Sequence, residues 1–169
     1  MKNRSAKPGK AIENVWSAQL RSKGLRATSA SVTALGCLSR SDQPLTHSEL
    51  GAAVEKSEGK AVERVTLYRV LERLAAVGLV SRYLRPDGAA RFGVSHPDAM
   101  GHFECNGCHR IIELSAGVVP QKVLVHLAQQ LQAQGIASGE LSLVIAGMCS
   151  QCSAAGQASP MVVMARAKD

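Results

Sequence analysis

Four of the five cysteines form two pairs with two-residue gaps, Cys105-Asn-Gly-Cys108 and Cys149-Ser-Gln-Cys152. Four thiolates around one Zn²⁺ make a closed tetrahedral site that leaves no position for a substrate. The alternatives are buried free cysteines and a thioredoxin-like redox pair. A redox pair would begin a helix after a buried strand, and neither pair has that context in the sequence. The spacing therefore predicts a structural zinc site.

Histidines gather around the first cysteine pair. His96, His102 and His109 bracket it, and Glu113 follows closely. Imidazole and carboxylate together suit a first-row divalent metal. His102 lies in a predicted strand that leads directly into the cysteine turn, so a second metal site is predicted near this residue.

Three other residues of these types receive simpler interpretations. His47 and His126 lie far from the cysteine pairs in the sequence and are interpreted as surface residues. Cys37 lies on the apolar side of a predicted helix and is interpreted as a small core residue.

The positive charge is confined to the N-terminal part of the chain. The 169 residues carry a formal net charge of +7. Residues 1–98 hold 16 Lys and Arg against 9 Asp and Glu, whereas residues 99–169 hold 4 of each. A basic segment joined to a neutral one indicates a polyanion-binding module beside a module with another role. Aromatic residues make up only 3%, which is too few for base-stacking platforms, so duplex DNA is favoured over single strands.

The apolar pattern argues against a membrane protein. The longest apolar runs, such as residues 143–148, are too short to span a bilayer. The basic N-terminus is not followed by the apolar segment of a signal peptide. We therefore expect a cytoplasmic protein without membrane contact, where paired cysteines bind metal rather than form a disulfide framework.

Residues 15–95 have the element order of a winged helix-turn-helix. Helices are predicted over residues 15–23, 28–39, 46–54 and 62–77, and the last has the clearest helical apolar repeat. Two β-compatible runs, residues 79–84 and 89–94, flank a Pro-Asp-Gly turn and predict the wing hairpin. Residues 1–14 are predicted to form a basic flexible arm.

The rest of the sequence predicts a smaller second domain. Together the two domains make the protein α+β in class. After a hinge at residues 96–101, residues 102–152 read as strand, strand, helix and strand. Residues 153–169 show no periodicity and are predicted to be a loose tail.

The outer faces of the helix predicted over residues 62–77 carry the residue types that bind DNA. Arginine can bind guanine or phosphate, and tyrosine can contact a thymine methyl group or a phosphate. The alternative is an ordinary solvated helix face. The basic total and the winged-helix order favour a recognition helix, with Arg64, Thr66, Tyr68 and Arg69 as DNA-binding residues.

At these residues the sequence resembles the ferric uptake regulator family of bacterial metal-sensing repressors, over about residues 15–152. The resemblance implies a winged helix, a dimerisation domain, a structural four-cysteine zinc and a regulatory metal at the hinge. It also implies a metal-loaded homodimer that binds an operator, with Tyr68 and Arg69 at recognition positions. The matching motifs are Gly24-Leu-Arg-Ala-Thr28, Val65-Thr-Leu-Tyr-Arg-Val-Leu71, Gly78-Leu-Val80, His102-Phe-Glu-Cys-Asn-Gly-Cys108, Ile112-Glu113-Leu114 and Gly147-Met-Cys-Ser-Gln-Cys152.

The sequence departs from the family at the regulatory ligands. A histidine usual before the third helix is replaced around Pro44, and the acidic ligand expected near the end of the wing falls around Gly93. Only His102 and Glu113 match the ligands typical of iron sensors. This favours the zinc uptake regulator branch, with His96, His102 and Glu113 as regulatory ligands and Cys37 or His109 as candidates for a fourth.

The sequence thus predicts a zinc-responsive repressor that binds palindromic double-stranded operator DNA as a homodimer. Each chain is expected to hold one structural and one regulatory Zn²⁺. Iron, manganese or peroxide sensing is the alternative within the family. A small zinc enzyme or a structural zinc-ribbon adaptor is the alternative outside it. The enzyme would need an open metal position or a reactive thiol, and the adaptor leaves the basic N-terminal part unexplained.

Overall fold

The computed structural model describes residues 10–84, 88–96, 98–115, 117–136, 140–156 and 162–168. The chain divides into two compact units, Met1–His96 and Pro97–Asp169. No helix within the described ranges is long and apolar enough to cross a bilayer.

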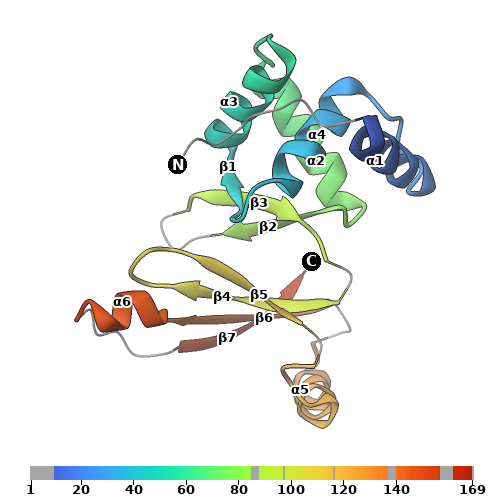
Figure 1. The fold of residues 1–169 in the computed structure, drawn as a ribbon. Helices are drawn as coiled ribbons and strands as arrows, with labels where there is room; N and C mark the ends of the chain where they lie inside the picture. Colours follow the sequence, from blue (N-terminus) through green and yellow to red (C-terminus); the bar gives the residue numbers. More distant parts are fainter. Residues whose placement is uncertain are drawn as a thin grey trace. The chain divides into compact units, whose positions relative to one another are not determined.

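The first unit combines four helices with a small antiparallel sheet, the arrangement of a winged helix-turn-helix (Figure 1). The strands are ordered β1-β3-β2, and the helices lie on one side of them. The helices are α1 (Lys10–Ser22), α2 (Ser29–Ser39), α3 (His47–Glu58) and α4 (Arg64–Ala76), and the strands are β1 (Leu45–Thr46), β2 (Val80–Leu84) and β3 (Ala90–Val94).

Local sequence signals account for the start of α2 and α3. The Thr28 side chain accepts a hydrogen bond from the Ser31 amide at the start of α2. Thr46 and Glu49 form a complete capping box at the start of α3, as their spacing predicts. The Glu49 carboxylate accepts a hydrogen bond from the Thr46 amide, which lowers the pKa of Glu49.

The apolar repeat of α4 faces the core of this unit. Leu67, Val70, Leu71 and Leu74 are buried at spacings of three and four residues. They join leucines of the other three helices, including Leu20, Leu35 and Leu50, in one hydrophobic cluster. Because this face is held in the core, the opposite face of α4 is turned to solvent.

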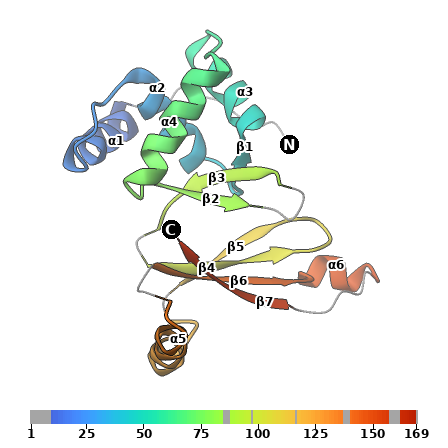
Figure 2. The ribbon, with the colours of Figure 1, turned by 180° about the vertical axis from the view of Figure 1, so that it is seen from behind.

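The second unit is built on a four-stranded sheet of order β5-β4-β6-β7. Strands β4 and β6 are parallel, and the other two pairs are antiparallel. Figure 2 shows α6 at one end of this sheet and α5 near the other. The elements are β4 (Ala99–Cys105), β5 (Ile111–Ser115), α5 (Gln121–Ala133), β6 (Glu140–Gly147), α6 (Ser150–Ala154) and β7 (Val162–Lys168).

The loose tail predicted for residues 153–169 is wrong at its start, where α6 extends to Ala154, and over Val162–Lys168, which forms strand β7. This strand pairs with β6 from Val162 opposite Ala146 to Lys168 opposite Glu140. Its hydrogen bonds come from a strand more than fifteen residues earlier, so no local repeat in residues 153–169 indicates it. Residues 157–161 lie outside the described residues.

The boundaries of the predicted arm and hinge also need correction. Helix α1 begins at Lys10, so residues 10–14 are helical rather than part of a flexible arm, while residues 1–9 lie outside the described residues. Strand β4 begins at Ala99 and includes half of the predicted hinge. Within it, a Cβ atom on Gly101 would lie 1.9 Å from the Leu143 carbonyl oxygen, so glycine permits the close approach of β6.

Candidate functional site

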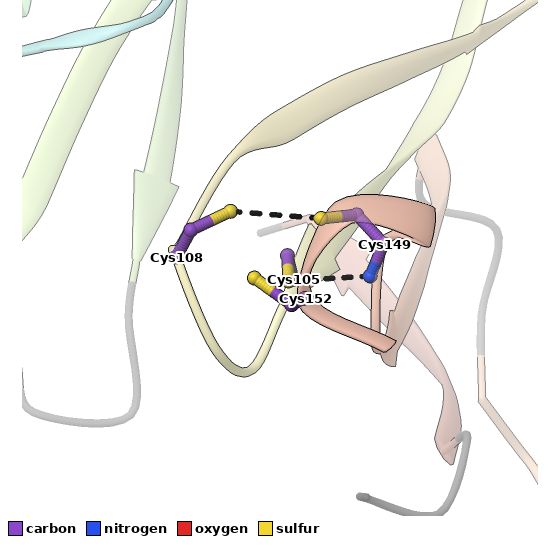
Figure 3. Close-up of side chains that lie close together, drawn as sticks. All are labelled: Cys105, Cys108, Cys149 and Cys152. Atoms are coloured by element: carbon purple, nitrogen blue, oxygen red, sulfur yellow. Dashed lines mark hydrogen bonds between the residues drawn. The ribbon is translucent and has the colours of Figure 1, made fainter. Parts of the chain in front are cut away.

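The four paired cysteines meet at one end of the second sheet. Cys105 is the last residue of β4 and Cys108 lies in the turn that follows, while Cys149 caps α6 and Cys152 lies within it. Strands β4 and β6 are parallel and bring Cys105 opposite Gly147, so both pairs follow strands that end side by side. All four sulfur atoms lie within 4.8 Å of one another, and Figure 3 shows them converging from the two elements.

Backbone hydrogen bonds hold the two cysteine-bearing segments together. The Asn106 amide donates to the Gly147 carbonyl at 2.7 Å. The Gly107 amide donates to the sulfur of Cys105 at 3.4 Å. The Cys149 amide donates to the same sulfur at 3.3 Å (Figure 3). Amide donors directed at a sulfur favour its thiolate form, which is the form that binds metal.

The acidities of the cysteines differ within the cluster. Burial raises the pKa of Cys105, but the amides of Cys108, Cys149 and Gly107 outweigh it and lower the pKa to about 6. Hydrogen bonding with Cys149, followed by burial, raises the pKa of Cys152 to about 12. Successive deprotonation of neighbouring sulfurs brings like charges together, and a divalent cation among them would remove that cost.

This donor set fits Zn²⁺ better than redox chemistry. Four sulfurs around one point match the tetrahedral thiolate site of structural zinc. The prediction that neither pair begins a helix is wrong, because Cys149 is the N-cap of α6 directly after β6. The redox alternative is nevertheless disfavoured, because Cys108 and Cys149 come from different pairs and their sulfurs lie 3.7 Å apart. The two pairs share one site.

His102 and Glu113 are direct partners across β4 and β5. Directly opposite residues of an antiparallel pair direct their side chains to the same face of the sheet. His102 is buried and Glu113 is half-buried. Among the described residues, the four cysteines are the set of three or more ligands close enough to hold a metal. His102 and Glu113 thus share one face of the sheet but are not part of such a set among the described residues.

The other regulatory candidates lie in different surroundings. His96 is exposed and follows β3 in the first unit. His109 has a left-handed backbone with φ of 59°, and its Nδ1 lies 3.6 Å from Oε1 of the buried Glu104. Glu104 is a residue that the sequence analysis missed, although its place two residues after His102 in a strand indicates the same face of the sheet.

Cys37 is a core residue rather than a metal-ligand candidate. It is buried in the hydrophobic cluster of the first unit. Its sulfur accepts a hydrogen bond from Nη2 of Arg40 at 3.6 Å. Burial raises the pKa of Cys37, which disfavours the thiolate form that a metal requires. Of the two candidates for a fourth regulatory ligand, this leaves His109.

Pro44 and Gly93, at the two positions where the family usually has ligands, lie against each other in the first unit. A Cβ atom on Gly93 would lie 3.3 Å from the Tyr83 ring and 3.4 Å from Cγ of Pro44. A carboxylate side chain at residue 93 would therefore need its neighbours to move. Neither residue has a side chain that binds metal.

The four predicted DNA-binding residues lie on the solvent face of α4. Tyr68 is 43% exposed, and Arg64, Thr66 and Arg69 are also exposed. Tyr68 stacks on His47, the first residue of α3, with ring centroids 4.1 Å apart. His47 is thus a neighbour of the predicted DNA-binding face, which sequence spacing does not reveal because the two residues are 21 positions apart.

Comparisons with known proteins agree on one family. The family model described as "Ferric uptake regulator family" matches residues 22–142. A ferric uptake regulation protein of Legionella pneumophila is 30% identical over 139 residues, which cover 80% of this chain and 97% of that protein.

Solved structures show the same fold. A ferric uptake regulator from Pseudomonas aeruginosa with manganese is 25% identical, covers 80% of this chain and 98% of its own, and has a TM-score of 0.60. A zinc uptake regulator in complex with zinc and DNA is 16% identical, covers 92% and 99%, and has a TM-score of 0.66.

Proposed function

Because the chain belongs to the ferric uptake regulator family, we propose that it is a zinc-responsive repressor that binds palindromic operator DNA as a homodimer. The family is one of metal-responsive transcription regulators, not enzymes. The observation that carries the DNA-binding proposal is the solvent face of α4, where Arg64, Thr66, Tyr68 and Arg69 project from a winged-helix unit. The fold shared with a zinc regulator complexed with zinc and DNA supports it.

The proposed structural zinc is held by Cys105, Cys108, Cys149 and Cys152. These residues tie the turn after β4 to the start of α6, across two strands that are far apart in sequence. Zinc bound there adds a cross-link to a unit in which few of the described residues are buried. The closed set of four sulfur ligands argues against a zinc enzyme.

The proposed regulatory zinc is held by His96, His102 and Glu113, with His109 as the candidate fourth ligand. His102 and Glu113 are paired in the sheet, while His96 belongs to the other unit. A metal that binds one arrangement of the two units better than others shifts the population towards it. The favoured arrangement is the one in which two recognition helices match successive major grooves.

A second copy of this chain is the proposed partner of α5. Leu124, Leu127 and Leu131 recur on one side of this helix, yet none of its residues, all of which the structure describes, is buried. Exposed Val118, Val123 and Ile136 lie close by in sequence. Apolar surface of this kind marks an interaction site, and a two-fold dimer suits a palindromic operator.

Replacement of Leu127 by glutamate is expected to convert the dimer to a monomer, because a charge in an apolar interface loses its hydration without gaining a partner. Light scattering after size-exclusion chromatography measures the mass, and circular dichroism checks that the helices remain. Gln129→Glu, which places the same charge on an exposed position of α5, is the control. A Leu127→Glu chain that remains fully dimeric would exclude α5 from the interface.

Replacement of Arg69 by alanine is expected to weaken operator binding by about 1–3 kcal/mol, the usual value of a direct base contact. Binding is measured on duplexes that the zinc-loaded protein selects from a random pool, over a series of salt concentrations. Affinity should fall steeply with salt, because Lys and Arg displace counterions from the phosphates.

The matched control is Lys122→Ala, which removes an exposed positive charge from α5. Loss on selected duplexes alone identifies a base contact, and equal loss on random duplexes identifies a phosphate contact. Unchanged binding of the Arg69→Ala chain to both duplexes would remove α4 from the recognition role. Titration with Zn²⁺, Fe²⁺ and Mn²⁺ in the same assay tests zinc sensing against iron and manganese sensing.

A further inference from the structure

His47 connects the start of α3 to the outer face of α4. Its ring stacks on the Tyr68 ring with 4.1 Å between centroids and 19° between planes. Two aromatic rings stacked nearly parallel in this way attract each other. Tyr68 is exposed at 43%, so one side of its ring is covered by the imidazole while much of the side chain stays in solvent.

The same imidazole also lies near the first turn of α4. The positive charge of Arg64, four residues before Tyr68 on the same helix, helps to lower the pKa of His47. Residues four apart share one helix face. His47 therefore lies against that face, next to two of the residues proposed to bind DNA.

The start of α4 lacks the usual side-chain cap. Glu63, the N-cap residue, makes no capping hydrogen bond with any described residue. The first amides of a helix need partners from outside the helix. In contrast, α3 begins with a complete capping box formed by Thr46 and Glu49. His47, the residue directly after Thr46, therefore extends from the well-anchored start of α3 to the uncapped start of α4.

The chemistry of His47 suits a contact made by the ring rather than by its charge. Burial lowers the pKa of His47, and the positive charge of Arg64 lowers it further. Both effects disfavour the charged form of the imidazole. Its Nε2 atom is buried and has no hydrogen-bond partner among the described residues. An unpaired buried nitrogen is unfavourable. The favourable contact that this side chain makes is the stack of its ring on Tyr68.

We propose that His47 is a positioning residue for DNA recognition, which holds the Tyr68 ring in the orientation that contacts the operator. A tyrosine on an exposed helix face otherwise samples several rotamers, and binding to DNA would have to restrict them. The stack on His47 already restricts the rotamers of Tyr68 in the protein without DNA. This inference rests on the proposed DNA-binding function, and its partner is duplex DNA with a thymine methyl group or phosphate within reach of Tyr68.

The test compares His47→Leu, which removes the flat ring, with His47→Phe, which keeps it. Both variants replace the imidazole nitrogens by carbon, so the loss of these polar atoms cancels in the comparison. The probes are duplexes selected by the zinc-loaded full-length protein from a random pool, with random duplex as the reference. Ser48→Ala, at the next and exposed position of α3, is the control.

His47→Leu is expected to weaken binding to selected duplexes about 2- to 10-fold, the equivalent of one aromatic pair, and to leave random-duplex binding unchanged. His47→Phe is expected to restore the affinity. In a Tyr68→Ala background His47→Leu should have no further effect, because residues that act as a unit are not additive. Equal losses in both backgrounds, or no restoration by phenylalanine, would overturn the positioning role.

These measurements distinguish failure of the positioning role of His47 from failure of the proposed DNA-binding function on which it rests. If the wild-type protein selects no sequence from the pool, the DNA-binding proposal is wrong and the positioning role is overturned with it. If the wild-type protein selects a sequence and Tyr68→Ala loses it while His47→Leu does not, only the positioning role is overturned. Melting temperatures of all variants distinguish lost recognition from lost folding.

Discussion

Replacement of Cys149 by serine is expected to remove the tightly bound zinc and to unfold or monomerise the second unit. Structural zinc contributes on the order of 10 kcal/mol in small zinc modules, which is comparable with the whole stability of a small domain, about 5–15 kcal/mol. Cys149 is central to the site because its sulfur lies 3.7 Å from that of Cys108 and its amide donates to Cys105. Serine keeps the amide but removes the sulfur, so the variant loses the sulfur that faces Cys108 of the other segment.

Metal analysis of the purified protein, thermal unfolding and light scattering measure this outcome together. The matched control is Ser150→Ala, the adjacent and exposed position at the start of α6, which should keep one zinc per chain. Removal of zinc from the wild-type protein with a chelator should reproduce the Cys149→Ser result. A Cys149→Ser dimer that retains its zinc would show that the four cysteines are not the structural site.

Replacement of His102 or Glu113 by alanine is expected to separate metal sensing from folding. Each variant should remain a folded dimer with one tightly held zinc, because neither residue belongs to the four-cysteine cluster. Each should lose the gain in operator affinity that added zinc produces. That gain corresponds to a coupling free energy of about 1–3 kcal/mol, or roughly 5- to 150-fold in affinity.

The measurement is operator affinity with and without added Zn²⁺, paired with metal content per chain. His126→Ala is the control, because it removes an exposed histidine from α5. Coupling is reciprocal, so operator DNA should tighten zinc binding by the same factor in the wild-type protein and have no such effect in the variants. Zinc-stimulated binding that survives both substitutions unchanged would place the regulatory site at other residues.

His109, the candidate for a fourth regulatory ligand, differs from His102 in its surroundings. His109 lies 3.6 Å from the buried carboxylate of Glu104, whereas His102 is opposite Glu113. Pro44 and Gly93 offer no ligand where the family usually has one. The ligands proposed for a regulatory zinc in this chain are therefore His96 and residues of the second unit.

The sequence by itself determined the features that depend on local spacing. Two-residue gaps within each cysteine pair predict the four residues that meet in one cluster, because a zinc-binding turn needs two thiolates within one short loop. The repeat of Leu67, Val70, Leu71 and Leu74 predicts both α4 and its outer face, because helical periodicity alone decides which residues share a side. The capping box at Thr46 was also predictable, since its partners are three residues apart.

Only the tertiary structure decided the features that join distant segments. The two cysteine pairs meet because β4 and β6 run parallel and finish at the same end of the sheet. Hydrogen bonds between residues 42 positions apart determine this arrangement. Strand β7 forms because its backbone pairs with β6 along its length. The stack of His47 on Tyr68 depends on how α3 packs against α4. None of these contacts follows from a local repeat, because non-local hydrogen bonds and side-chain packing decide them.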